Sequence, residues 1–495
     1  MKKGSITPFC ALSLMLVASL IFALLESARI YKLNTYATLK AESGMDSLCG
    51  GYQPFLWQQY GLLFLDGAYG TEKFSMAYVS EELEKQIEGS MGKADFSFCE
   101  VAVDGYSIAT DGAGALFLDY VAERQKENLP LGIAEDIYQE YHHVDELAWE
   151  YTGTEEAIEE AQSVFASIKA EWQEKIRILW KWNENNPGAE VEIPTIDTSV
   201  IENTWDMVDQ MKNSSFLQLI FGEISELSQK QSNVQSRLQE RKKETGTMRI
   251  STEGNWYRKI LVLSYLEEYF SCYIQNQKAH FLEYEMEYIL CGEDAEWKNL
   301  EGALKRILWL REAANTAHLV QDKEKMAIVE ALANIVGFMA GENPAVVKII
   351  EAGIVGAWAY FESILDLRSL VAGERIPFIK QEDEWTIEIR NIFSIFDKNA
   401  KAKVCSDGLE YIDYLKQLLF MTEEKKMAYR MMEVMEIGMK EQQNYQNCRM
   451  DHMLVILKYK INFESRPIFQ SFITTGKTYD GKLLFTKEVQ RSYIP

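Results

Sequence analysis

The sequence predicts a mainly helical protein of the α+β class, with a transmembrane helix at its N-terminus, a large multi-helix extracytoplasmic body and a small antiparallel sheet. Three observations lead to this prediction. Residues 6–25 carry no charge, and about 20 apolar residues let an α-helix span the hydrocarbon core of a bilayer. Strong helix formers with an apolar period of 3.6 residues dominate residues 71–441. Residues 455–463 alternate with a period of two, which is typical of a half-buried strand.

The N-terminal anchor is predicted to place the body outside the membrane. Lys2 and Lys3 precede the apolar run, and the positive-inside rule puts such a tail, residues 1–5, in the cytoplasm. Strong helix formers continue after the membrane span, so residues 26–43 are expected to extend the same helix and to pack on the body through an apolar stripe. Gly44 is the predicted end of this helix.

Two other interpretations of the N-terminus stay open. A cleaved secretory signal usually has an apolar region of only about 7–15 residues and a small-x-small cleavage site, and residues 23–28 match such a site poorly. A pilin-type leader has a short basic tail, a glycine where it is cleaved, and an apolar helix that continues into the body. The layout around Gly4 fits that pattern. The sequence therefore predicts a retained anchor and leaves cleavage after Gly4 open.

The first part of the body, residues 44–186, is predicted to be helical around a single strand. Residues 71–91 carry an apolar face at helical spacing, and residues 135–185 form one long helical region that is broken at Gly153. Residues 96–108 alternate in a way that predicts a strand. Because a strand must pair, its partner is expected elsewhere in the chain.

The second part, residues 199–441, is predicted to be a helical body that follows a loop or domain seam at residues 187–198, where two of the nine prolines lie. The expected helices are 199–244, 256–289, 298–320, 323–339, 344–370, 408–421 and 423–441. Residues 344–370 look like a second membrane span. Three charged side chains, Lys348, Glu351 and Glu362, lie inside its apolar run at residues 345–365, so a buried core helix is predicted instead.

The C-terminal segment, residues 442–495, is predicted to complete the sheet. One face of the strand at 455–463 is apolar and consists of Val455, Leu457, Tyr459, Ile461 and Phe463. A turn signal at residues 479–482 predicts a hairpin after it. A lone hairpin is marginally stable in water, so we expect residues 455–463 to share a sheet with residues 96–108.

The net charge of −24 excludes some partners. Nucleic acid would need a basic face. An acidic body is repelled by anionic lipid, so membrane lipid is expected to bind the N-terminal helix alone. The charged run at residues 237–246 is expected to be a solvated hairpin tip.

The cysteines leave the redox state of the body open. Cys10 lies in the membrane helix, and six more lie outside it: Cys49, Cys99, Cys272, Cys291, Cys405 and Cys448. Six cysteines in an exported body permit three disulfides, with Cys272 and Cys291 the nearest pair in sequence. Buried free thiols also suit a body with a large core.

The densest group of chemically versatile side chains is His142-His143 with Asp145 and Glu146. His142 and Glu146 share a helix face, as two metal ligands would. Zinc needs three or four converging ligands, and no other histidine lies near in sequence, so these residues are predicted to be a solvated helix face. Phosphate-binding, nucleophile and calcium motifs are absent. We therefore predict no catalytic, cofactor-binding or metal residue, and no enzyme.

Several blocks resemble an uncharacterised family of single-anchor proteins of Gram-positive bacteria. They are KGSIT with Phe9, LLESARI (24–30), WQQYGLLFLD (57–66), EYILCGEDAEWKNL (287–300), LWLREAANTAHLVQD (308–322), GERIPFIKQEDEW (373–385), YIDYLKQLLFM (411–421), YRMMEVMEIGMK (429–440) and CRMDHMLVILKYKINFES (448–465). Proteins of that family look like components that accompany the Tad/Flp pilus assembly system, akin to the pseudopilin-like TadE and TadG proteins. One position departs from pilins, which carry Glu at the fifth position after the cleaved glycine, where Phe9 stands here.

The resemblance implies a structural or accessory component of a Tad/Flp-like pilus or secretion system, with other components of that system as partners. A second hypothesis is an anchored surface protein that binds a ligand or a cell-wall component through a cleft in the helical body. A third, an anchored hydrolase, would need a convergent pocket of His, Asp and Glu side chains.

Overall fold

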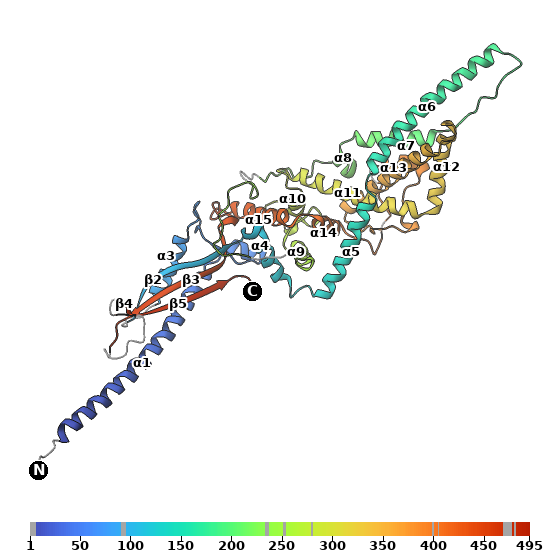
Figure 1. Cartoon of the computed structure of the whole chain (residues 1–495). Helices are drawn as coiled ribbons and strands as arrows, with labels where there is room; N and C mark the ends of the chain where they lie inside the picture. Colours follow the sequence, from blue (N-terminus) through green and yellow to red (C-terminus); the bar gives the residue numbers. More distant parts are fainter. Residues whose placement is uncertain are drawn as a thin grey trace. The chain divides into compact units, whose positions relative to one another are not determined.

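The computed structural model describes most of the chain and divides it into two compact units. The described residues are 6–90, 96–232, 237–250, 254–278, 281–397, 400–403, 405–468, 478–479 and 482–495. Unit 1 comprises residues 1–126, 236–254 and 431–495, and unit 2 comprises residues 127–235 and 255–430 (Figure 1). The protein is mainly helical with one small antiparallel sheet, as the sequence predicts.

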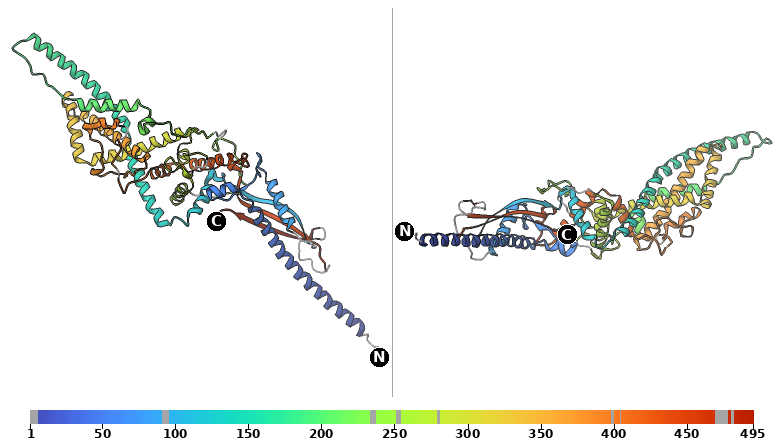
Figure 2. Two further views of the ribbon diagram at one scale, coloured as in Figure 1. Left: turned by 180° about the vertical axis from the view of Figure 1, so that it is seen from behind. Right: turned by 60° about the horizontal axis from the view of Figure 1, so that its bottom comes forward.

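Unit 1 is a sheet with a long helix packed along it. The helices are α1 (Ile6–Cys49), α2 (Pro54–Tyr60), α3 (Met76–Gly89) and α4 (Ala115–Gln125), with short 3₁₀ turns at Asp111–Gly114 and Met450–His452. The strands are β1 (Leu65–Asp66), β2 (Phe96–Ile108), β3 (Met453–Ser465), β4 (Thr478–Tyr479) and β5 (Lys482–Ser492). The central strand β3 pairs antiparallel with β2 on one side and with β5 on the other. In Figure 2 the second half of α1 runs alongside these strands.

The predicted union of the C-terminal strand with residues 96–108 is confirmed. β2 has the predicted bounds, and Val101 pairs with Ile461 in the β2–β3 ladder. The five apolar side chains of the predicted face of β3 are all buried. Leu457, Tyr459, Ile461 and Phe463 form one core with α1 and α3. In this core the rings of Phe96 and Phe463 stack with centroids 5.2 Å apart. Two residues of the predicted hairpin turn, Asp480 and Gly481, lie outside the described residues.

Gly44 does not end α1, so that prediction is wrong. The helix continues to Cys49 and is followed by Gly50 and Gly51. Gly44 is buried, and a Cβ atom there would lie 2.6 Å from Cγ1 of Ile87 in α3. The glycine therefore serves close helix packing rather than helix termination.

Unit 2 is a helical body. Its helices are α5 (Leu131–Glu150), α6 (Thr154–Asn185), α7 (Ser199–Lys212), α8 (Phe216–Phe221), α9 (Trp256–Tyr269), α10 (Glu285–Cys291), α11 (Glu296–Gln321), α12 (Lys323–Met339), α13 (Pro344–Val371) and α14 (Tyr411–Met421). Short 3₁₀ turns lie at Asn276–Lys278, Glu382–Glu384 and Ile389–Phe396, and α15 (Glu424–Lys440) begins in unit 2 and ends in unit 1. The predicted break at Gly153 is confirmed by its φ of 90°.

The central helix of unit 2 is α13, which confirms residues 344–370 as a core helix. It packs against α6, α11 and α12, and most of its second half is buried, including Glu362. Two glycines let α6 approach closely: a Cβ atom on Gly353 would lie 2.1 Å from the Cβ of Ala161, and one on Gly356 would lie 3.1 Å from Cγ1 of Ile158.

Two long predicted helices are shorter in the structure. The helix predicted at 199–244 ends at Lys212, continues only as α8, and gives no further helix among the described residues up to 244. The helix predicted at 256–289 ends at Tyr269. The backbone then turns, and two of its amides donate hydrogen bonds to buried carboxylates. The amide of Ser271 donates to Glu285 at 2.9 Å and that of Tyr273 donates to Glu287 at 2.9 Å.

Candidate functional site

The first half of α1 has the properties of a membrane anchor. No side chain of residues 6–25 is buried in the structure, although most are large and apolar. Its most apolar 18-residue window is long enough and apolar enough to cross a bilayer. Exposed apolar surface of this extent is unfavourable in water. The segment therefore suits lipid, as an anchor or as a signal sequence.

The second half of the same helix is part of the fold of unit 1. Ala37, Ala41, Met45 and Leu48 are buried against α3 and the sheet. At the start of this half, Arg29 pairs with Glu26, its Nε lying 3.4 Å from Oε2 of Glu26. One helix thus has an exposed apolar half and a packed half with no break between them.

Polar contacts from the last strand also hold α1 on the sheet. Nζ of Lys487 donates to Oδ1 of Asn34 at 2.7 Å, and Nε of Arg491 lies 2.6 Å from Oδ1 of Asp46. The hydroxyl of Tyr493 donates to the carbonyl of Cys49 at 2.7 Å. The C-terminal end of the chain therefore fixes the part of α1 that follows the apolar half.

A charged cluster in unit 1 overturns the prediction of a solvated tip at residues 237–246. The guanidinium of Arg241 is buried and forms a bidentate pair with Glu436, with distances of 2.7 and 2.6 Å, and it also pairs with Asp451. Burial raises the pKa of Glu436, but the hydrogen bonds and charge of Arg241 outweigh it and lower that pKa to about 2. The charged run gives no local sign of this, because both partners come from distant parts of the sequence.

A second charged cluster lies in the core of unit 2. Arg311, Glu362, Asp366 and Lys380 have fully buried side chains. Nε of Arg311 lies 2.9 Å from Oδ2 of Asp366, and Nζ of Lys380 lies 2.6 Å from the other oxygen, Oδ1, and also pairs with Glu362. Burial raises the pKa of Asp366, but Lys380 and Arg311 outweigh it and hold the pKa below its ordinary value.

Two members of this core cluster also hydrogen-bond to backbone groups of the segment that follows α13. Arg311 donates through Nη1 to the carbonyls of Pro377 and Phe378 at 2.9 and 2.6 Å. Glu362 accepts from the amides of Thr386 and Ile387 at 3.0 and 2.9 Å. The cluster therefore fixes the irregular segment after α13 onto α11 and α13. Its charges are paired and enclosed, so it offers no reactive group to a substrate.

His142 and its neighbour Glu146, which the sequence places on a solvated helix face, lie on the surface of α5. His142 and Glu146 in α5 face each other, with Nδ1 and Oε1 3.5 Å apart, and both side chains are exposed. His142 also contacts the ring of Tyr138. Among the described residues, no three His, Cys, Asp or Glu side chains are grouped so that they could hold a metal ion. All seven cysteines are free thiols in the structure, Cys272 and Cys291 included.

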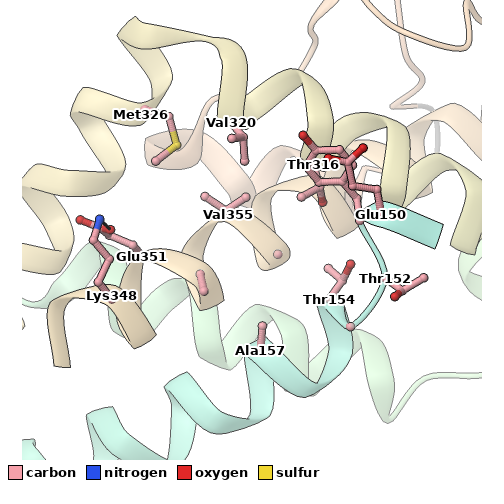
Figure 3. Close-up of a pocket in the computed structure, with 14 residues that line it drawn as sticks. Glu150, Thr152, Thr154, Ala157, Thr316, Val320, Met326, Lys348, Glu351 and Val355 are labelled. Atoms are coloured by element: carbon pink, nitrogen blue, oxygen red, sulfur yellow. Dashed lines mark hydrogen bonds and ion pairs between the residues drawn. The ribbon is translucent and has the colours of Figure 1, made fainter. Parts of the chain in front are cut away.

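One pocket of about 350 Å³ lies within unit 2, where α5 passes into α6 (Figure 3). Thr152, Thr154 and Thr316 lie at one end of it, and Lys348 and Glu351 pair at 2.5 Å near the other. Apolar side chains line the space between, namely Ala157, Val320, Met326, Ala352 and Val355. The described lining contains threonine hydroxyls and the carboxylates of Glu150 and Glu351, and it contains no histidine or cysteine.

Comparison with known proteins gives a family without an assigned activity. A model of a family of unknown function, DUF5702, matches residues 195–465, which is more than half of the chain. No curated protein and no solved structure matches. The matched range contains the core cluster of unit 2 and strand β3, and α1 lies outside it.

Proposed function

This chain belongs to DUF5702, a family of unknown function, and from that premise we propose that it is a membrane-anchored, extracytoplasmic structural or accessory component of a Tad/Flp-like pilus or secretion system. The proposal has three parts: the anchor and its orientation, a role that is not enzymatic, and the kind of assembly.

One observation carries the proposal, namely the division of α1 into two halves. Residues 6–25 present an apolar surface that only lipid or another apolar partner can cover, whereas the second half of the helix buries Ala37, Ala41, Gly44, Met45 and Leu48 in unit 1. Because the helix is continuous, a bilayer around its first half would hold unit 1 at the membrane surface. The basic tail at Lys2 and Lys3 favours a cytoplasmic N-terminus and an extracytoplasmic body.

The buried charged clusters support a structural role. Arg241 and Arg311 each bind carboxylates and both are enclosed, so their interactions stabilise segments of the fold. The described lining of the pocket in Figure 3 contains no histidine or cysteine. A protein of this kind acts through its surface and its anchor rather than through chemistry.

The Tad/Flp assignment rests on the sequence blocks that resemble the anchored family, and the layout of unit 1 supports it. An N-terminal helix that is lipid-facing in its first half and packed on an antiparallel sheet in its second half is the layout expected of a pilin-like subunit. Phe9, at the position where pilins carry Glu, favours an accessory subunit over one that is polymerised into a filament.

Labelling with a membrane-impermeant maleimide tests the orientation. Cys99 is exposed in β2 of unit 1, so intact cells should incorporate label at Cys99, and a Cys99→Ser variant should lose that increment. Label that reaches Cys99 only after the cells are lysed would place the body in the cytoplasm and would overturn the proposal.

Deletion of the gene tests the assembly role. We expect loss or shortening of surface pili, or of the secretion that depends on them, with restoration by the full chain and no restoration by a chain that lacks residues 6–25. Genes for a secretion ATPase and a TadC-like membrane protein should lie beside it. An organism that has this gene but lacks such a system would contradict the assembly role and leave the anchor untouched.

The pocket of Figure 3 favours a second candidate function, an anchored surface protein that binds a ligand or cell-wall component. Ala352 lines the pocket and is exposed, so Ala352→Trp should fill the space without disturbing the core. Binding of cell-wall fragments that is measured by calorimetry and abolished by Ala352→Trp would support this candidate, and binding that is unchanged would exclude this pocket.

A further inference from the structure

A second pocket of unit 2, of about 430 Å³, lies where the C-terminal ends of α5, α10 and α14 meet the middle of α11. We call it the tryptophan pocket, after Trp149 and Trp309 in its lining. Sites for small molecules have volumes of about 300–1,000 Å³, so this pocket has the size of such a site. Its described lining has no residue in common with that of the pocket in Figure 3.

Two tryptophans form one wall of the tryptophan pocket. Lys305, Arg306 and Trp309 are spaced by three and four residues, so they share one face of α11. The ring of Trp309 contacts that of Trp149, the last but one residue of α5, with centroids 5.6 Å apart and the planes at 67°. Trp149 is still 66% exposed, so much of its ring is open to a ligand.

The rest of the apolar lining comes from α10 and α14. Leu290 and Leu418 are buried and Met421 is half-buried. The thioether of a methionine adapts to the shape of a neighbouring ring, and aromatic rings prefer edge-to-face or offset contacts with one another. The two indoles with this floor therefore suit a ligand with an aromatic body.

The charged side chains of the tryptophan pocket are cations. Its described lining contains Lys305 and Arg306 and no acid. Lys305 pairs with Glu301 at 2.7 Å. Glu293 and Glu301 line the neighbouring hollow, and within the described part of the chain neither forms an ion pair with Arg306. Arg306 is therefore the cation that a ligand in this pocket would find without a carboxylate partner.

The acids that neighbour the lining in sequence have other surroundings. Glu150, which follows Trp149, lines the pocket of Figure 3 instead. Glu423 pairs with Lys426 at 3.3 Å, and Glu424 pairs with Arg258. These carboxylates therefore do not change the sign of the charge in the tryptophan pocket.

The guanidinium of Arg306 is held in place at the pocket. Its Nη1 donates to the carbonyl of Leu290 near the end of α10 at 2.8 Å. Among the described residues, none accepts a hydrogen bond from its Nε or Nη2. These two nitrogens lie on one edge of the planar group, and such an edge binds a carboxylate through two parallel hydrogen bonds.

We propose that the tryptophan pocket binds a small monoanion that joins an aromatic body to one carboxylate. The body lies against Trp149 and Trp309, and the carboxylate accepts from Nε and Nη2 of Arg306. A single negative charge fits better than two, because Lys305 already has Glu301 as its partner. The inference uses neither the orientation of the anchor nor the role in a pilus.

Calorimetric titration with three ligands of one shape tests the proposal. The full chain is held in nanodiscs and titrated with 4-phenylbutyrate, 4-phenylbutanol or 4-phenylbutylamine, and the heat given by empty nanodiscs is subtracted. These ligands share the aromatic body and differ in charge. We expect the carboxylate to bind about tenfold to hundredfold more tightly than the alcohol, as a charge-assisted pair of hydrogen bonds allows, and the amine to bind most weakly.

Two variants separate the charge from the aromatic wall. Arg306→Gln should weaken the binding of phenylbutyrate to the level of the alcohol and leave the alcohol unchanged. Trp149→Ala should weaken both ligands by the same factor. The matched control is Arg375→Gln, which changes the net charge by the same unit at a surface pair with Glu410 outside the pocket, and it should keep the preference for the carboxylate.

The fold of the variants is checked by circular dichroism, which should be unchanged because Arg306 and Trp149 are exposed. Arg306→Lys keeps the charge without the planar fork, so it should retain part of the preference for the carboxylate over the alcohol. Equal affinity of the wild type for phenylbutyrate and phenylbutanol overturns the proposal. A preference that survives Arg306→Gln overturns it as well, and so does the absence of saturable binding of phenylbutyrate.

Discussion

Glu100 in β2 and Asn462 in β3 are paired in one ladder although 362 residues separate them, and Nδ2 of Asn462 donates to Oε1 of Glu100 at 2.9 Å. The strand that completes the sheet of unit 1 is therefore among the last segments of the chain, while the helix that carries the apolar anchor is the first. Unit 1 cannot complete its core until nearly all of the sequence is present.

Truncation after Asp451 should unfold unit 1, because it removes β3, β4 and β5 and leaves β1 and β2 without a partner strand. A milder form of the same test is Phe463→Ala, which removes a buried ring stacked on Phe96 and should lower the free energy of unfolding by about 3–5 kcal/mol. Urea unfolding gives the value. Leu484→Ala, at an exposed position of β5, is the control and should cost far less.

Gly353→Ala should destabilise unit 2 by about 1–3 kcal/mol, because the new Cβ would meet Ala161 at 2.1 Å and force α6 and α13 apart. Gly356→Ala meets contacts at 3.1 Å and should cost less. Gly132 in α5 has open space around it, so Gly132→Ala should be neutral or stabilising. Thermal melting of the three variants gives the order, and a Gly353→Ala variant as stable as Gly132→Ala would contradict the close packing.

Glu287 should make the stability of unit 2 depend on pH. Burial raises its pKa to about 7 from 4.5, against the hydrogen bonds of the Tyr273 amide and the Tyr411 hydroxyl. Between these values the unfolded chain loses the proton and the folded chain keeps it, so the free energy of unfolding falls as pH rises from 4.5 to about 7. Glu287→Gln should reduce this slope in urea unfolding curves that are recorded across the range. Glu312, whose pKa burial raises to about 8, should supply a further part of it.

The exposed Glu293→Gln is the control for Glu287 and should leave the slope unchanged. A slope that is the same in the wild type and in Glu287→Gln would mean that Glu287 is ionised in the folded state.

Arg311→Met should lower the free energy of unfolding by about 3–5 kcal/mol, because it removes one partner of a buried charged cluster and leaves Asp366 with less compensation. The matched control is Arg375→Met. Arg375 pairs with Glu410 on the surface, where such a pair contributes about 0–1 kcal/mol. Equal costs for the two variants would show that the cluster is not the structural centre of unit 2.

The sequence predicts those elements whose signal is local. β2, the face of β3, the break at Gly153 and the core helix α13 all follow from periodicity, glycine or charge within a short window. The same reasoning finds the long apolar segment at residues 6–25, since an uncharged run of that length is visible by itself.

The parts that could not be predicted depend on partners far apart in sequence. Gly44 looks like a helix end until Ile87 is known to pack on it. The sequence around Arg241 is typical of a solvated segment, and its partners Glu436 and Asp451 are known only from the fold. The cluster around Arg311 joins α11, α13 and the segment after α13, and each charged residue taken alone is typical of a helix surface.

The most direct test of the anchor is mass spectrometry of the N-terminus of the protein recovered from the membrane fraction. We predict that the recovered chain still contains residues 6–25, either complete or cleaved after Gly4, and that a chain without residues 5–25, exported by a secretory signal, is recovered in the soluble fraction. A mature N-terminus beyond Leu25, or full-length protein that is soluble without detergent, would contradict the anchor.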